Sequence, residues 1–295
     1  MFGLMEDSIN GILMGSIYGL TALGLTIIFG VLKVINFAHG SLLMVAMYAA
    51  FWAVTLTGVH PYVALVLVVP FMFLFGYYLQ DIVIKPIFKA ERDVREPITV
   101  IIVTTGVWYI LDNLALFIFG PQYRALPVNP LRGKMLEFGG MMVSVPKLWG
   151  FVAAMIVAAA IYVFFQKSRM GRAIRATSLD RDAASLMGIG QYKIYNIAFG
   201  IGTAIAGVAG VVLVPFYNVF PSVGVLFDIK CFIIVVLGGL GSIWGAMLGG
   251  IIVGMIESVG PQFMTATWTE AIVYGLFLLV LFVKPSGLFG VRAEW

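Results

Sequence analysis

Long apolar runs separated by short polar stretches dominate the hydrophobic pattern of this chain. Each run is close to the roughly 20 residues that cross a bilayer as one helix, and none alternates apolar and polar residues as a membrane β-strand does. The runs predict transmembrane helices at 8–30, 41–57, 61–84, 98–119, 148–166, 194–217 and 270–284.

A further apolar stretch, 229–257, is too long for one plain span and is rich in glycine. We interpret it as two short helices around the turn LGGLGS, either a tight hairpin or a re-entrant pair. The pattern therefore predicts an all-α integral membrane protein of about eight transmembrane helices, including broken or re-entrant Gly-rich segments. The whole chain, 1–295, is expected to form a single transmembrane domain.

A second interruption, KVINFAHGS at 33–41, places Asn36 and His39 between two apolar runs. A helix can break at membrane depth only where protein or a cavity satisfies the freed amide groups. Two interpretations remain open: the polar side chains bind a zwitterionic cargo, or they cap the next helix. The two breaks supply the candidate translocation pathway, which comprises Asn36, Phe37, His39, Gly40, Ser41, Gly239, Gly241 and Ser242.

Small residues recur at every fourth position in three runs, which places them on one helix face and favours close helix packing. These positions are Gly11, Gly15 and Gly19, then Ala198, Gly202, Ala206 and Gly210, then Gly241, Gly245 and Gly249.

The basic residues predict how the chain is oriented. Segments 31–40, 85–96, 166–193 and 284–295 hold 13 of the 18 Lys and Arg residues, which places these segments in the cytoplasm. Loop 120–147 is then external, although it holds four of the other five.

Composition removes several classes of function. The chain is 61% hydrophobic and 11% charged, with a mean hydropathy of +1.04, so most of it must contact lipid or protein. One cysteine, Cys231, allows no disulfide framework or cysteine metal site. The sequence contains no phosphate-binding loop, no metal-ligand spacing, no hydrolase triad and no basic aromatic patch for nucleic acid. We therefore expect no enzyme and no bound cofactor.

The longest interior polar segment, 167–193, contains a predicted helix at 172–187. Its mildly apolar face would carry Ala176, Leu179, Ala183 and Leu186, opposite Arg181. Such a face suits a partner protein, while the alternative is an ordinary positive-inside loop.

Four stretches of the sequence carry a family resemblance. They are NGILMGSIYGLTALGLTIIFGVLKVINFAHGSLLMVAMYAA, SRMGRAIRATSLDRDAASLMGIG, GGLGSIWGAMLGGIIVGMIES and VKPSGLFG. In this order, and over nearly the whole chain, they resemble the LivH-like permease subunits of the bacterial branched-chain amino-acid ABC transporters.

The resemblance implies a permease subunit of an ATP-driven importer in the bacterial inner membrane. Its implied partners are a second, LivM-like permease, two cytoplasmic ATPases that bind ATP and Mg, a periplasmic binding protein, an amino-acid substrate and membrane lipid. Relatives for urea and short amides leave the cargo open, and an ATP-independent channel or carrier remains the alternative. The implied ATPase-coupling residues lie in the 167–193 loop: Gly171, Arg172, Arg175, Ala176, Asp180, Ala183, Ala184 and Gly188.

Overall fold

A computed structural model describes residues 2–91, 98–126, 131, 133–138 and 141–290 of the chain. Within these residues, eight helical segments are long and apolar enough to cross a membrane, which confirms the all-α membrane class. The eight segments contain α1 (Phe2–Leu32), α2 (His39–Thr57), α3 (Leu65–Leu79), α5 (Ile98–Phe119), α6 (Val145–Lys167), α9 (Gln191–Leu213), α11 (Ile243–Val259) and α12 (Ala266–Val283). A further helix, α10 (Val223–Gly238), has 16 residues and is not among the eight.

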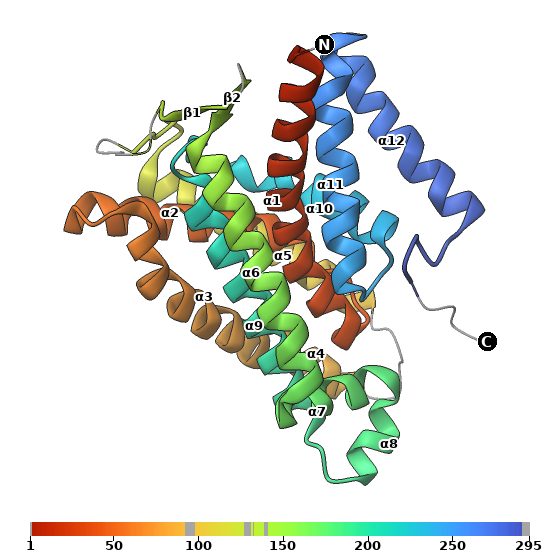
Figure 1. Ribbon diagram of the computed structural model, residues 1–295. Helices are drawn as coiled ribbons and strands as arrows, with labels where there is room; N and C mark the ends of the chain where they lie inside the picture. The colour runs from red at the N-terminus through yellow and green to blue at the C-terminus, as the bar shows by residue number, and fades with distance from the viewer. Residues whose placement is uncertain (1, 92–97, 127–130, 132, 139–140, 291–295) are drawn as a thin grey trace.

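Helix α1 runs through the middle of the molecule and packs along α11 (Figure 1). The two helices approach closely because glycine faces glycine: a Cβ atom added to Gly15 would lie 2.6 Å from the carbonyl oxygen of Gly250. The predicted packing role of the small-residue face is therefore confirmed for α1. In the most apolar stretch of α1, 83% of the residues are buried inside the protein, compared with 17% in α5 and in α12. The outer helices therefore keep apolar faces for lipid or a partner.

The third predicted span is longer than expected. It begins with a 3-10 turn at Pro61–Ala64, continues through α3 and a π turn at Gln80–Ile84, and ends with α4 (Lys85–Ala90). An ion pair of 2.5 Å between Lys85 and Asp81, one helical turn apart, stabilises this extension. The predicted interior loop 85–96 is therefore shorter, and residues 92–97 lie outside the described part of the chain.

The Gly-rich stretch forms two helices, as predicted, joined as a tight hairpin. Helix α10 ends at Gly238 and α11 begins at Ile243, and the turn between them holds Gly239 at φ +104°. A Cβ atom on Gly238 would collide with the carbonyl of Gly245, which keeps the two helix ends in contact. Helix α10 begins at Val223, before the predicted start at residue 229.

The two polar loops lie at opposite ends of the molecule (Figure 1). The end that carries the N terminus also holds an antiparallel hairpin of β1 (Met135–Phe138) and β2 (Met141–Ser144), within the predicted loop 120–147. Residues 127–130, 132 and 139–140 of that loop lie outside the described residues. The opposite end carries α7 (Arg169–Leu179) and α8 (Arg181–Leu186).

Candidate functional site

The first helix break lies between α1 and α2. Lys33 adopts the left-handed conformation at φ +58° and ends α1, an uncommon position for a residue other than glycine. The chain then turns back so that α2 begins at His39, deep inside the protein. The His39 ring lies with Nε2 2.9 Å from the carbonyl oxygen of Thr21 on α1. His39 is therefore tied to the centre of the helix bundle and is 1% exposed.

Asn36 satisfies much of the broken backbone. Its side-chain Oδ1 accepts a hydrogen bond from the backbone N–H of Ala38 at 3.1 Å, and its carbonyl accepts one from His39 at 3.3 Å. These contacts form a local turn just before α2, whose N-cap residue, Ala38, has no side-chain cap. The Asn36 amide nitrogen, Nδ2, is buried and makes no hydrogen bond to any described residue.

A carboxylate from a distant helix completes the start of α2. The backbone N–H of Gly40 donates to Oδ1 of Asp228, on α10, at 2.6 Å. The adjacent Ser41 hydroxyl donates to Oδ1 of Asp112, on α5, at 2.6 Å. One free backbone N–H at the start of α2 is thus bound to a carboxylate that the protein itself supplies.

The apolar pattern does not single out Asp228, because this residue lies just before the predicted start of the Gly-rich stretch at residue 229. The signal lay in the sequence FDIK, which places Asp228 and Lys230 inside an otherwise apolar run. Ionisable residues inside a membrane span are rare and mark functional positions.

An apolar pocket of about 240 Å³ opens beside this helix start. Ile35, Asn36 and Phe37 of the break border it together with Asp228, and its remaining walls come from α1, α5 and α10: Leu25, Trp108, Val225, Ile229 and Phe232. Of the five predicted residues of the first break, Asn36 and Phe37 line this pocket, whereas His39, Gly40 and Ser41 form the first turn of α2.

The predicted residues of the second break lie elsewhere. The Ser242 hydroxyl caps α11 by accepting a hydrogen bond from the Gly245 N–H at 3.1 Å, and Gly239 packs against Gly290. Gly241 and Ser242 line another cavity, of about 390 Å³, which Arg175 and Leu179 of α7 also border. This cavity is distinct from the one that Asn36 and Phe37 border, although Lys33 of the first break also lines it.

The predicted single helix at 172–187 is wrong, because two short helices take its place. The Asp180 side chain caps α8 by accepting hydrogen bonds from Asp182 N–H at 2.9 Å and Ala183 N–H at 3.0 Å. Asp180 itself is extended, which ends α7. The sequence SLDRD carries this signal, since aspartate is a preferred N-cap residue.

The predicted coupling residues differ in how far they are buried, and some of them face the permease itself. Gly171 and Ala184 are buried against the permease itself, and Gly188, at φ +79°, ends the segment. Arg175 donates to the Gln166 side chain at 2.8 Å, and Ala176 is half-buried. Arg172, Asp180 and Ala183 are exposed. Gly171 and Ala184 therefore shape the segment and do not face outward.

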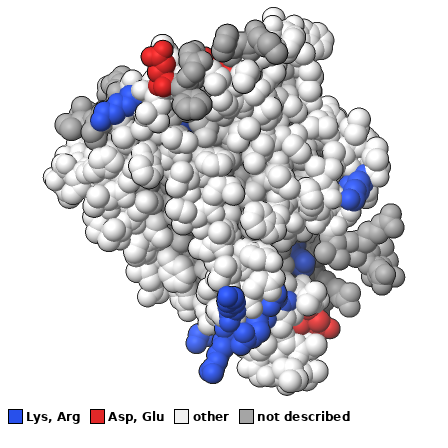
Figure 2. Space-filling model, in the orientation of Figure 1, with Lys and Arg blue, Asp and Glu red and all other residues white. Residues whose placement is uncertain are grey.

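Three large apolar side chains project from α7 and α8 into open space. Leu179, Leu186 and Met187 are 88%, 89% and 82% exposed. We call these residues the apolar tip. Figure 2 shows basic side chains gathered at the same end of the molecule, where Lys167, Arg169, Arg172 and Lys193 are exposed. An exposed apolar tip beside a basic surface is the composition of an interface with another protein.

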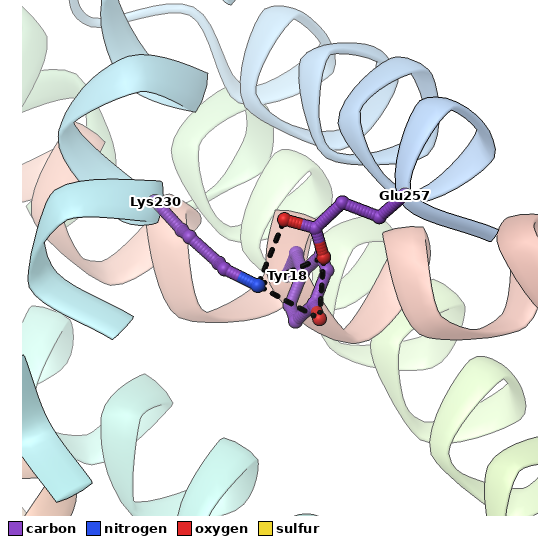
Figure 3. Close-up of polar contacts among 3 residues, drawn as sticks. All are labelled: Tyr18, Lys230 and Glu257. Atoms are coloured by element: carbon purple, nitrogen blue, oxygen red, sulfur yellow. Dashed lines mark hydrogen bonds and ion pairs between the residues drawn. The ribbon is translucent and has the colours of Figure 1, made fainter. Parts of the chain in front are cut away.

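A charged cluster joins three helices elsewhere in the bundle (Figure 3). Lys230 of α10 lies 2.8 Å from Glu257 of α11, and the Tyr18 hydroxyl of α1 donates to the same carboxylate at 2.9 Å. The Lys230 ammonium also lies 4.8 Å from the Tyr18 ring centre. The structure thus gives the intramembrane Glu257 carboxylate two partners, Lys230 and Tyr18, that the sequence alone does not reveal.

We expect Lys230→Met to destabilise the protein, because Glu257 would keep its charge with only the Tyr18 hydroxyl as partner. The loss should be about 1–3 kcal/mol, since the pair is only partly exposed. Thermal unfolding in detergent measures the change. The double variant Lys230→Met with Glu257→Leu should recover most of the loss; a double variant that loses the sum of both single changes would contradict the pairing.

The fold defines a multi-pass α-helical membrane protein with the helix breaks and projecting loop of a transport permease. The sequence profile of the family described as "Branched-chain amino acid transport system / permease component" matches residues 8–281. The chain belongs to this family, and it is a multi-pass protein of the bacterial inner membrane. It is accordingly a transport subunit.

Two relatives match almost end to end. The chain is 32% identical to the high-affinity branched-chain amino acid transport system permease protein BraD of Pseudomonas aeruginosa, over 98% of this chain and 97% of BraD. It is 31% identical to the corresponding LivH protein of Escherichia coli, over 97% of this chain and 95% of LivH. Among solved structures, PsaBC from Streptococcus pneumoniae in complex with Fab is similar at a TM-score of 0.47 and 13% identity, covering 95% of this chain and 92% of that chain.

Proposed function

We propose that this chain is one of two permease subunits of an ATP-driven importer for branched-chain amino acids. The second permease is LivM-like, two cytoplasmic ATPases bind ATP and Mg, and a periplasmic binding protein delivers the amino acid. The relatives named for branched-chain amino acid transport support this cargo. ATP chemistry belongs to the partner subunits.

The apolar tip carries this proposal. Leu179, Leu186 and Met187 lie at the end of the molecule where exposed basic side chains gather, the expected cytoplasmic end. A stand-alone carrier has no use for such a surface, whereas an ATPase subunit would cover it. Closure of the ATPases would move α7 and α8, and through them α6 and α9, so that the permease alternates between outward and inward access. The N terminus and the β1–β2 hairpin then lie outside.

We expect leucine uptake to require the complete complex. Proteoliposomes that contain both permeases and both ATPases should take up radiolabelled leucine when ATP is enclosed and loaded binding protein is added. The same vesicles with an ATPase subunit that cannot hydrolyse ATP serve as the control. Leucine uptake by the purified chain alone would establish a carrier instead. Competition by urea or acetamide but not by valine would show that the cargo is urea or a short amide.

A further inference from the structure

Two acidic side chains meet at the start of α2 without a basic partner among the described residues. Asp228 and Asp112 lie on either side of its first turn, joined to it through the Gly40 N–H and the Ser41 hydroxyl. Across the described ranges, no Lys or Arg side chain forms an ion pair with either carboxylate. A helix N-terminus contributes roughly half a positive charge, less than two carboxylates need. The site therefore favours a cation.

Asp228 and Asn36 keep hydrogen-bonding capacity, whereas both oxygens of Asp112 accept hydrogen bonds, from Ser41 and from Trp108 Nε1 at 2.8 Å. Asp228 uses Oδ1 for Gly40, and no described residue donates to Oδ2. Asn36 uses Oδ1 for Ala38, while its Nδ2 group, in a side chain from a residue only 3% exposed, has no acceptor among the described residues. A buried donor without an acceptor costs free energy, so its retention here is consistent with a ligand that accepts from it.

The pocket that Asn36 and Asp228 share has the size and lining for a small aliphatic group. Its volume of about 240 Å³ lies just below the roughly 300 Å³ at which pockets for drug-sized ligands begin. Aliphatic and aromatic side chains form its walls, among them Val225 and Ile229 of α10. Such walls gain free energy from burying a branched hydrocarbon chain.

We propose that this pocket, with Asp228 and Asn36 at its edge, is a subsite for the amino acid during its passage through the permease. The Asp228 carboxylate accepts from the α-ammonium group, the Asn36 amide donates to the α-carboxylate, and the apolar walls hold the branched side chain. This inference rests on the proposed function. It assigns to Asp228 a part in cargo recognition in addition to its bond with Gly40.

Asp228→Asn tests the charge while it keeps the contact to α2, because the asparagine Oδ1 still accepts from the Gly40 N–H. Binding of radiolabelled leucine to the assembled complex, without the binding protein, measures the subsite directly. We expect a loss of leucine affinity of about tenfold or more, the scale of a charge-assisted hydrogen bond. Asp81→Asn is the matched control, since Asp81 is bonded to Lys85 and Asn196 away from the pocket, and it should leave leucine affinity unchanged.

Selectivity separates recognition from a purely structural role. The wild-type complex should prefer leucine to 4-methylpentanoate, which lacks the ammonium group, and Asp228→Asn should abolish that preference. If that variant does not assemble, Val225→Phe fills the pocket without changing a hydrogen bond and should lower leucine affinity about tenfold. Unchanged leucine affinity in Val225→Phe, or a preference for leucine that persists in Asp228→Asn, would overturn the subsite.

The subsite and the proposed function fail in different ways. If the wild-type complex drives ATP-dependent leucine uptake and Asp228→Asn binds leucine as tightly as wild type, the subsite is rejected and the importer stands. If the wild-type complex takes up no leucine with ATP and binding protein present, the importer for branched-chain amino acids is rejected.

Discussion

Replacing Gly40 with alanine is expected to prevent stable assembly of the permease. The new methyl group would collide with the carbonyl oxygen of Gly224 and lie 2.7 Å from the Asp228 carboxyl carbon. Neither can move away cheaply, because one is backbone and the other is bonded to the Gly40 N–H. Overpacking and the loss of that charge-assisted bond together cost about 2–5 kcal/mol. This loss is a large fraction of the free energy of unfolding of a typical folded protein.

The melting temperature and the yield of monodisperse protein in detergent measure this effect. Gly106→Ala is the matched control, because Gly106 also lies inside a helix and no heavy atom lies within 4 Å of its added Cβ. The control should be neutral or slightly stabilising, since alanine is the better helix former. Equal melting temperatures for the two variants would show that Gly40 of α2 does not approach Gly224 and Asp228 of α10 this closely.

Placing aspartate at both Leu179 and Leu186 is expected to disrupt binding of the permease to the proposed partner ATPases. Both side chains are almost fully exposed in the isolated chain, so the substitutions should leave its fold intact. In the complex they would put two carboxylates into an apolar contact, where desolvation makes them costly. We expect ATP-driven leucine uptake to fall at least about tenfold, which corresponds to a loss of about 1.4 kcal/mol in the contact.

Co-purification of the ATPases with the tagged permease measures the contact separately from uptake. Leu136→Asp places the same change on an exposed leucine of the β1–β2 hairpin, at the opposite end of the molecule, and should leave co-purification complete. If the double variant retains both ATPases and full uptake, the apolar tip is not the docking surface.

The pattern of apolar runs was sufficient to predict the helices, because lipid leaves the backbone few alternatives to a helix. Glycine and the INFAHG string also located both breaks. The pairing of Asp228 with Gly40 could not be predicted, since it joins residues 188 positions apart in the chain. The same holds for Lys230 and Glu257, whose partnership depends on how α10 and α11 lie against α1.

One error had a local cause. The apolar face alone predicts a single helix at 172–187, although Asp180 is followed by a sequence that begins a new helix. The predicted pathway residues of the two breaks border different cavities, and only the tertiary structure reveals this arrangement.

The glycine contact between α1 and α11 sets a time order for biosynthesis. The ribosome completes α1 first, yet Gly15 finds its partner only when Gly250 has been made, 235 residues later. At about 5–20 residues per second, this interval lasts roughly 10 to 50 seconds. During that interval the glycine face of α1 must be covered by lipid, by the insertion machinery or by a helix that is already made, such as α6 or α9. A chain released before α11 is made would therefore leave the glycine face of α1 without its partner helix.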